Sequence, residues 1–320
     1  MPWSVSEMKT TAPISAVIAT RHRAKSLSRT LDSLLEQDLL PAEFIVVDAS
    51  GDDATKNLMS EFEKRVAPSA LVRWAKADIA GAASQRNQGV ACATQPFIWF
   101  FDDDVMFEPN CSERLWEAIE SDRQLGGVNA MIVNQRYQSP GFVSRAMFTL
   151  MNGKPEETFA GRVIGPAINL LPEDREDLPE VVPVEWLNLG ATIYRREALP
   201  HPPFDAVFKG YSLMEDLTLS LRVGKKWRLA NVRKARIFHH SQATAEKGDH
   251  AEMAKMELIN RHYVMTEILG RSKMSDLMKL ALYEAFQLAA SAYNRPRALP
   301  AVMKGQFGAL TTLLRRDRKS

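Results

Sequence analysis

The 320-residue sequence is long enough to bury a large core and to hold one α/β domain with an appendage. It carries 41 Lys and Arg residues against 39 Asp and Glu residues, and this balance does not indicate a general affinity for nucleic acid. The two cysteines, Cys92 and Cys111, cannot form a disulfide framework, which indicates a reducing compartment.

Strands and helices are predicted to alternate through the first hundred residues. Short apolar runs predict four strands, at 14–19, 44–48, 72–75 and 97–101. Helices are predicted between them, at 26–37, after the 51–53 turn and at 81–94. This alternation predicts a mostly parallel central sheet flanked by helices, a Rossmann-like arrangement in which ligands bind beyond the carboxyl ends of the strands.

The fourth predicted strand runs directly into three aspartates, Asp102, Asp103 and Asp104. The apolar run before them predicts a strand buried on both faces. Three adjacent carboxylates would repel one another unless a positive group lies nearby, and carboxylate oxygens suit Mg²⁺ or Mn²⁺. A solvated acidic turn, or Asp104 as a helix cap, is the alternative. The second strand also ends in an aspartate, Asp48, so we expect all four carboxylates to share one crevice.

The second half of the sequence is less regular. Ordered segments are predicted at 128–133, 186–194 and 235–240. We interpret 134–180 as an irregular excursion. A glycine-containing loop then leads to Glu215 and Asp216, which open a short helix. A charged first helical turn is favoured by the helix dipole and is an alternative interpretation of this pair. From about residue 250 the chain is predicted to be helical.

Taken in order, these motifs resemble family 2 of the inverting, GT-A-type glycosyltransferases over about residues 12–245. The resemblance is carried by the Thr20–Arg23 turn, the Asp48 turn, the Arg-Asn-x-Gly helix at 86–89, the Asp102–Asp104 triplet, the 189–196 stretch, Glu215-Asp216 and the His239-His240 strand. It implies a GT-A-type domain over 12–245 and a helical C-terminal extension over 246–320.

The resemblance further implies that side chains of the first half bind a nucleotide-sugar donor, with UDP, GDP or dTDP as the nucleotide: Thr20, Arg23, Asp48, Arg86, Asp102 and Asp103. In this assignment Asp48 hydrogen-bonds the nucleobase and Asp102 contacts the ribose. Asp103 lies between the other two aspartates and points the opposite way by strand alternation. A surface salt bridge is the alternative for either arginine.

Metal and catalytic residues are also implied by the resemblance. Asp104 would bind the divalent cation, Mg²⁺ or Mn²⁺, that bridges the donor phosphates. Neighbouring strand residues face opposite ways, so only one of the two histidines can enter the site; we favour His239 over His240 as a second metal ligand, and a structural role is the alternative. Asp216 would be the general base, and Glu215 would support it or bind the acceptor.

The implied activity is an inverting transfer of a sugar to a hydroxyl of a glycan or lipid-linked acceptor, as in polysaccharide biosynthesis. A sugar nucleotidyltransferase is one alternative, but such enzymes place a glycine-rich loop after the first strand, and 20–26 contains no glycine. A catalytically silent glycan- or nucleotide-sugar-binding protein is the other, although it would need no metal site. A Rossmann dehydrogenase is excluded because the chain has no G-x-G-x-x-G motif.

The C-terminal segment 295–320 combines seven basic residues with one acid. Apolar residues recur in it at helical spacing: Leu299, Met303, Phe307, Leu310 and Leu314. This combination predicts peripheral contact with an anionic membrane surface. Packing on the catalytic domain or on a second subunit is an equal alternative. No signal peptide or transmembrane segment is predicted, so we expect a cytoplasmic protein, with the inner face of the membrane as the surface it would contact.

Overall fold

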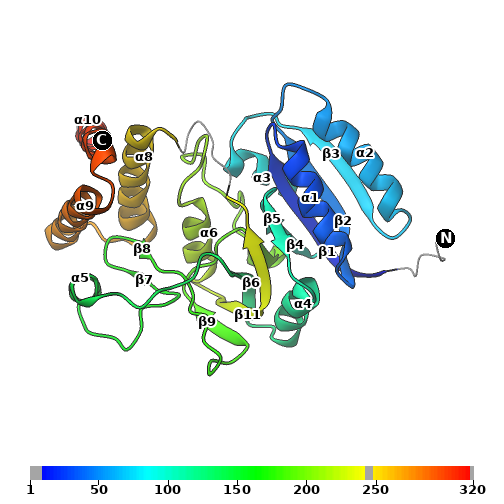
Figure 1. Ribbon diagram of the computed structural model, residues 1–320, viewed down its shortest axis with the longest axis horizontal. Helices are drawn as coiled ribbons and strands as arrows, with labels where there is room; N and C mark the ends of the chain where they lie inside the picture. The colour runs from blue at the N-terminus through cyan, green and yellow to red at the C-terminus, as the bar shows by residue number, and fades with distance from the viewer. Residues whose placement is uncertain (1–8, 242–247, 318–320) are drawn as a thin grey trace.

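The computed structural model describes residues 9–241 and 248–317, and one mixed β-sheet forms its centre (Figure 1). The strands of this sheet run in the order β3-β2-β1-β4-β10-β6-β11-β5, and β9 also pairs with β11. Core side chains of α1, α2 and α4 pack on one face of the sheet, and those of α3 and α6 pack on the other. The predicted α/β architecture with a flanked central sheet is therefore confirmed.

The first half of the sheet is fully parallel, as expected. Its strands are β1 (Thr10–Thr20), β2 (Leu39–Asp48), β3 (Leu71–Lys76) and β4 (Phe97–Phe101). The helices between them are α1 (Ala24–Leu35), α2 (Ala54–Val66) and α3 (Ala82–Cys92). In β4, Trp99 and Phe101 enter one core cluster while Ile98 and Phe100 enter the other. The strand that precedes the aspartate triplet is therefore buried on both faces.

The second half of the sheet is mixed, because β10 (Ala191–Arg195) lies antiparallel between β4 and β6. Strand β6 (Leu125–Ile132) pairs in parallel with the long β11 (Arg228–His239). The far side of β11 carries two short antiparallel strands, β5 (Val105–Phe107) and β9 (Val181–Val184). The helical elements here are α4 (Cys111–Ser121), the 3-10 turn η1 (Arg196–Ala198) and α6 (Glu215–Val223). Strand β10 thus joins the two halves into one sheet.

The segment 134–180 is not irregular throughout, and that part of the sequence interpretation was wrong. It contains α5 (Phe142–Asn152) and the hairpin of β7 (Val163–Ile164) and β8 (Ile168–Asn169). Within α5 only Met151 is fully buried, and several large apolar side chains face outward. A helix that exposes apolar residues lacks the one-sided pattern by which helices are found in a sequence.

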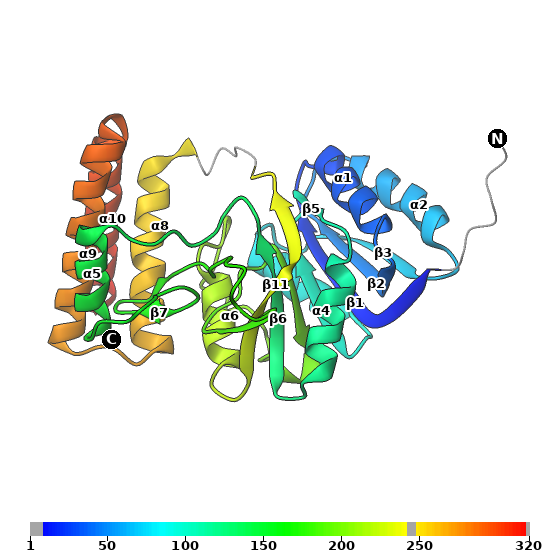
Figure 2. The same ribbon diagram turned by 60° about the horizontal axis from the view of Figure 1, so that its bottom comes forward.

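The C-terminal helices form a layer at one end of the molecule (Figures 1 and 2). They are α8 (His250–Tyr263), the π-helical turn η2 (Val264–Ile268), α9 (Met274–Asn294), the 3-10 turn η3 (Pro296–Ala298) and α10 (Leu299–Asp317). Helix α10 packs so closely on α8 that a Cβ at Gly305 would collide with the carbonyl oxygen of Ala251. None of the described helices combines the length and apolar character needed to cross a bilayer. The domain division expected at 245/246 falls on 242–247, outside the described residues, and stays a prediction.

Candidate active site

A cavity of about 430 Å³ opens at the carboxyl ends of β1 and β4. Its wall contains nearly all of the site residues expected from the sequence: Thr20, Arg23, Arg86, Asp102, Asp103, Asp104, Glu215, Asp216 and His239. These side chains come from the ends of β1, β4 and β11, from α3 and from the start of α6. The fold therefore gathers into one cavity groups that lie up to 219 positions apart in the sequence, from Thr20 to His239.

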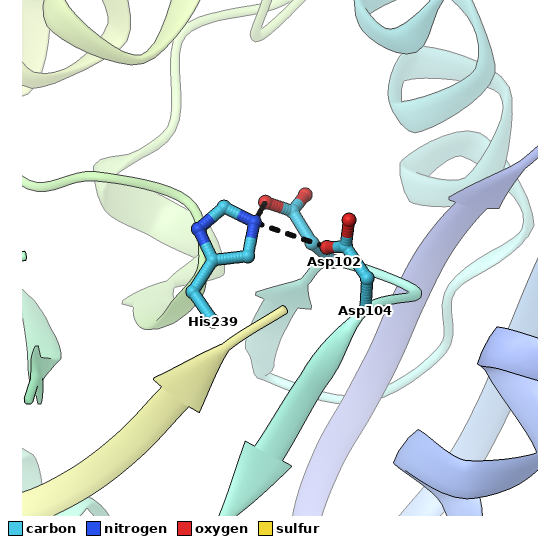
Figure 3. A group of neighbouring side chains, drawn as sticks. All are labelled: Asp102, Asp104 and His239. Atoms are coloured by element: carbon cyan, nitrogen blue, oxygen red, sulfur yellow. Dashed lines mark ion pairs between the residues drawn. The ribbon is translucent and has the colours of Figure 1, made fainter. Parts of the chain in front are cut away.

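Backbone pairing brings His239 opposite the aspartate triplet. In the pairing of β11 with β5, His239 lies across from Val105, and the backbone N–H of His240 donates to the carbonyl oxygen of Asp104 at 2.8 Å. The Nε2 atom of His239 lies 3.0 Å from Oδ1 of Asp104 and 4.0 Å from Oδ2 of Asp102 (Figure 3). Two carboxylates and one imidazole therefore converge on one point.

The geometry of this group fits a divalent cation. One ligand atom from each of Asp102, Asp104 and His239 lies within 4.8 Å of the other two. Adjacent ligands of an octahedral ion with bonds of about 2.1 Å are about 3 Å apart, and opposite ones about 4.2 Å. The amide of Gln135 lies 3.3 Å from Nδ1 of His239 and orients the ring, as outer partners of metal-binding histidines do. The ring of His240 is turned away, toward Phe238, with centroids 4.6 Å apart.

The middle aspartate, Asp103, faces the first strand. The hydroxyl of Thr20 donates to Oδ2 of Asp103 at 2.6 Å, and Nη1 of Arg23 donates to its Oδ1 at 3.0 Å. The same guanidinium nitrogen lies 3.2 Å from Oδ2 of Asp104. Burial raises the pKa of Asp103 to about 6, although the bond from Thr20 and the charge of Arg23 oppose this rise. Asp103 thus points away from His239, as strand alternation requires.

Asp48 lies at the same edge of the sheet but does not line the cavity. It pairs across the β1–β2 ladder with Thr20 and is fully buried. Its Oδ1 accepts hydrogen bonds from the backbone N–H and hydroxyl of Ser50, at 2.8 and 2.5 Å. The indole N–H of Trp74 donates to its Oδ2 at 3.4 Å. The carboxylate is therefore held rigidly, next to the cavity rather than inside it.

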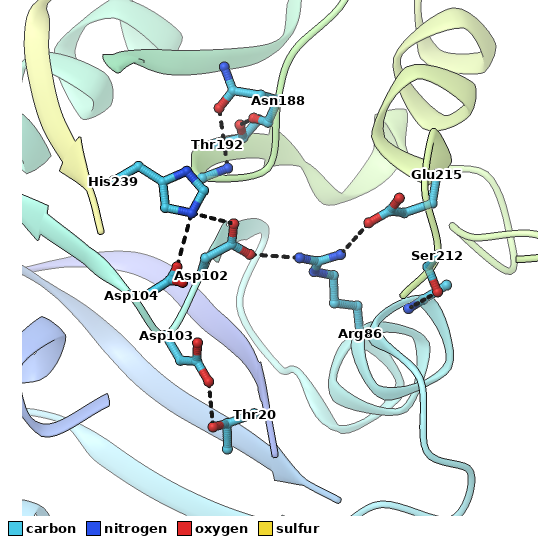
Figure 4. Close-up of polar contacts among 12 residues, drawn as sticks. Thr20, Arg86, Asp102, Asp103, Asp104, Asn188, Thr192, Ser212, Glu215 and His239 are labelled. Carbon is cyan, nitrogen blue, oxygen red and sulfur yellow. Dashed lines mark hydrogen bonds and ion pairs between the residues drawn. The ribbon is translucent and has the colours of Figure 1, made fainter. Parts of the chain in front are cut away.

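Arg86 links the two acidic groups of the cavity (Figure 4). Its Nη2 donates to Oδ1 of Asp102 and its Nη1 donates to Oε1 of Glu215, both at 2.8 Å. The side chain is only 7% exposed, and the guanidinium lies over the ring of Phe204. Burial alone would lower the pKa of Arg86, but the two carboxylates raise it. A fully ionised arginine is therefore fixed between the end of β4 and the start of α6.

The rest of the Arg-Asn-x-Gly helix explains why Arg86 is held so firmly. The neighbouring Gln85 donates through its amide to the carbonyl oxygens of Thr20 and Val47. Asn87 exchanges two hydrogen bonds with the backbone of Phe204, at 2.8 and 3.0 Å. These contacts join α3 to the ends of β1 and β2 and to the segment before α6. The motif is thus a structural connection as well as part of the cavity wall.

The acidic pair at the start of α6 has perturbed acidity. Burial raises the pKa of Glu215 to about 8, and the nearby charge of Asp216 adds to this rise while Arg86 opposes it. Burial also raises the pKa of Asp216 to about 6, against the hydrogen bond from the backbone N–H of Leu217. Both carboxyl groups are more basic than usual, which is the property that a proton acceptor at neutral pH needs.

Several cavity residues were not expected from the sequence: Gln135, Leu171, Trp186, Asn188 and Tyr211. The first two belong to the segment 134–180, for which no motif was found. Tyr211 lies in the loop before α6, and burial together with the surrounding carboxylates raises the pKa of its hydroxyl to about 12. For these residues the sequence offers a single signal, which is the position of Tyr211 four residues before Glu215.

Comparisons with known proteins agree with this arrangement. The sequence profile of Glycosyl transferase family 2 matches residues 15–160. The uncharacterized glycosyltransferase YwdF of Bacillus subtilis (strain 168) is 34% identical over 110 residues, which cover 34% of this chain and 38% of the relative. The matched part therefore spans well under half of that relative.

Two solved structures share the fold over most of the chain. The mannosyltransferase PcManGT from Pyrobaculum calidifontis, in complex with GDP-Man and Mn²⁺, has a TM-score of 0.54 at 16% identity and covers 98% of this chain and 84% of its own. TarS of S. aureus, in complex with UDP-GlcNAc, has a TM-score of 0.56 at 14% identity and covers 91% of this chain and 79% of its own. The chain thus has the GT-A-type fold, and its residues 15–160 match the sequence profile of glycosyl transferase family 2.

Proposed function

We propose that the protein is a metal-dependent, inverting glycosyltransferase that moves a sugar from a nucleotide-diphosphate donor to a hydroxyl of a glycan or lipid-linked acceptor. One observation carries this proposal. The group Asp102, Asp104 and His239 and the pair Glu215-Asp216 line the same cavity, and one guanidinium joins them. A cation site for the leaving group and a base for the attacking hydroxyl are the two parts that this reaction needs.

The donor half of the proposal rests on the first part of the sheet. We assign the donor to the cavity wall formed by the Thr20–Arg23 turn and the aspartate triplet, with Asp48 close to the nucleobase. The solved relatives of this fold that bind GDP-Man and UDP-GlcNAc support a nucleotide sugar as the donor class. Arg23 already offsets part of the negative charge of Asp103 and Asp104, which lowers the repulsion that a diphosphate would meet at this acidic edge.

Asp216 is the proposed base in a single displacement. The acceptor oxygen bonds to the anomeric carbon from one face while the bond to the diphosphate breaks on the other, and Asp216 takes the hydroxyl proton. A divalent cation held by Asp102, Asp104 and His239 would neutralise charge on the departing diphosphate. Arg86 fixes Glu215 beside the base, and Glu215 orients the acceptor. The raised pKa of Asp216, about 6, makes it a better proton acceptor than an exposed aspartate.

The test begins by finding the donor with a thermal-shift screen of UDP-, GDP- and dTDP-sugars, each with Mn²⁺ and with EDTA. Asp216→Asn should retain donor binding and lose transfer by roughly 10²–10⁴-fold, the usual contribution of a positioned base. Glu215→Gln should lose less. Asp205→Asn is a matched control, because Asp205 pairs with Arg222 outside the cavity. Near-normal turnover of Asp216→Asn, or a product with retained anomeric configuration by NMR, would contradict the proposal.

A further inference from the structure

The outward face of α9 carries large apolar side chains at helical spacing. Met274, Met278, Leu282 and Tyr293 are all exposed, and Tyr293 is 88% exposed. The positions between them on this stripe are alanines, at 281, 285, 289 and 292, and these are exposed too. No charged residue interrupts the stripe from 278 to 293, since Lys279 and Glu284 lie on other faces and are half-buried. A water-facing helix surface normally carries charged residues at such positions.

The outward face of α10 repeats this pattern. Met303, Phe307, Leu310 and Leu314 lie three or four residues apart and are exposed, with Phe307 at 70%. The opposite face of the same helix is already packed: Gly305 and Gln306 are buried, and Ala309 is fully enclosed. The exposed stripe is therefore a second apolar face on a helix whose inner face is already packed against the protein.

Helix α5 extends the apolar surface. Its Met151 packs with Tyr283 of α9 in one core cluster, and Lys279 donates to the carbonyl oxygen of Met151 at 3.0 Å. On its outer side Phe142 is 90% exposed, and Leu150 is also exposed. Figures 1 and 2 both show α5 beside α9 at the end of the molecule away from α2. The exposed residues of α5, α9 and α10 together are called the apolar end surface.

The charges around the apolar end surface are mainly positive. Arg295 and Arg297 lie in the turn between α9 and α10, and Lys304 and Arg315 flank the stripe of α10; all four are exposed. None of the four forms an ion pair with another described residue of 9–241 or 248–315. The nearest acid in α9, Glu284, is turned inward to Gln306 and Arg261. Basic groups therefore border the apolar stripes without neutralising partners in the described part of the chain.

We propose that the apolar end surface docks on a lipid bilayer that contains anionic headgroups. Methionine, leucine and phenylalanine side chains would enter the boundary between headgroups and acyl chains, and the bordering arginines and lysines would contact lipid phosphates. A second copy of this chain is a less suitable occupant, because it would bring the same arginines and lysines against one another. The helices lie on the bilayer rather than cross it, which agrees with their length and composition.

The experiment is co-sedimentation of the full chain with two kinds of vesicle: phosphatidylcholine alone, and phosphatidylcholine with about 30% phosphatidylglycerol to supply anionic headgroups. Two variants remove one feature each. Phe307→Ser with Leu310→Ser removes apolar anchors and should weaken binding at least about tenfold. Arg295→Gln with Arg297→Gln should weaken binding about fivefold for each charge lost, only on anionic vesicles.

Leu71→Ser is the matched control, because Leu71 is an exposed apolar residue of β3, and Figure 1 shows this strand at the other end of the molecule. It should bind vesicles as the unaltered protein does. Circular dichroism checks that each variant is folded. Equal pelleting of the Phe307 and Leu310 variant and the unaltered protein would overturn the proposal. So would light scattering that shows a lipid-free dimer which these two substitutions convert to a monomer. No readout involves sugar transfer, so the outcome is independent of the proposed activity.

Discussion

Replacement of Arg86 by methionine tests whether this arginine holds the acidic cavity together. The substitution removes two charge-assisted hydrogen bonds of 2.8 Å and keeps an unbranched side chain against Phe204. The partner Glu215 is 12% exposed, whereas Asp102 is 30% exposed. Breaking a buried ion pair by removing one partner costs about 3–5 kcal/mol, and a partly exposed pair contributes about 0–1 kcal/mol. We therefore expect a loss of about 1–3 kcal/mol at pH 8.5, mostly from Glu215; it lies below the full range because this carboxyl, whose pKa is already about 8, can take up a proton once Arg86 is gone.

The assay is urea unfolding followed by tryptophan fluorescence, to which the buried Trp99 and Trp186 contribute, at pH 8.5 and pH 6, in EDTA so that no cation replaces the lost charge. The matched control is Arg65→Met, because Arg65 pairs with Asp32 at the surface and should contribute at most about 1 kcal/mol. A total stability of about 5–15 kcal/mol makes the expected loss easy to measure. An Arg86→Met protein within about 1 kcal/mol of the unaltered one at pH 8.5 would refute the reasoning.

The direction in which pH changes the stability loss of Arg86→Met can be worked out. The pKa of Glu215 is about 8 in the folded protein, above the value of about 4.3 in an unfolded chain. The folded state therefore binds more protons between these values, and the stability from this proton is complete below about 4.3 and lost as the pH rises through 8. Without Arg86 the carboxylate is harder still to ionise. The deficit of the variant should consequently be smaller at pH 6 than at pH 8.5.

Three further outcomes are expected. Asp104→Asn should weaken Mn²⁺ binding, measured by calorimetry, by more than the ~10–100-fold typical of an outer-shell change; unaltered affinity would remove Asp104 from the site. Gly305→Ala should destabilise the protein by about 1–3 kcal/mol through overpacking on α8. Gly308→Ala should instead stabilise it by about 0.5–1 kcal/mol, because the added Cβ meets only the flexible Lys255. Thermal unfolding of the two variants measures both effects. Transfer should fall about tenfold per unit below pH 6 as Asp216 takes up a proton, and a flat pH–rate profile to pH 5 would contradict its role.

The first half of the fold was predictable because its signals are local. Each parallel strand is a short apolar run, and β4 spans Phe97–Phe101, the range predicted from the sequence. Details of single side chains were less predictable. Asp53 occupies the N-cap position of α2 but makes no side-chain cap hydrogen bond, whereas Oδ1 of Asp52 accepts from the backbone N–H of Ala54. An N-cap carboxylate would accept from the second or third N–H of the helix, so the contact that Asp52 makes with the first N–H does not replace it.

The site was predictable as a set of residues but not as a set of contacts. Strand alternation separated Asp103 from its neighbours and His239 from His240, and the structure has both separations. The bridge from Arg86 to Glu215 was not foreseen, because it joins residues 129 positions apart through the packing of α3 against α6. The roles assigned to these residues remain predictions until the variants are measured.

The antiparallel strand β10 makes the family-matched segment dependent on the later part of the chain. A fragment that ended at residue 160 would lack β10, so the backbone of β4 from Phe97 to Phe101 would become an open sheet edge. The same cut would remove the strand that carries His239. Residues 15–160 are thus a unit of sequence similarity but not an autonomous folding module. Exchange of the later part of the chain between relatives would therefore succeed only if the incoming strand matched β4 in register and side-chain size.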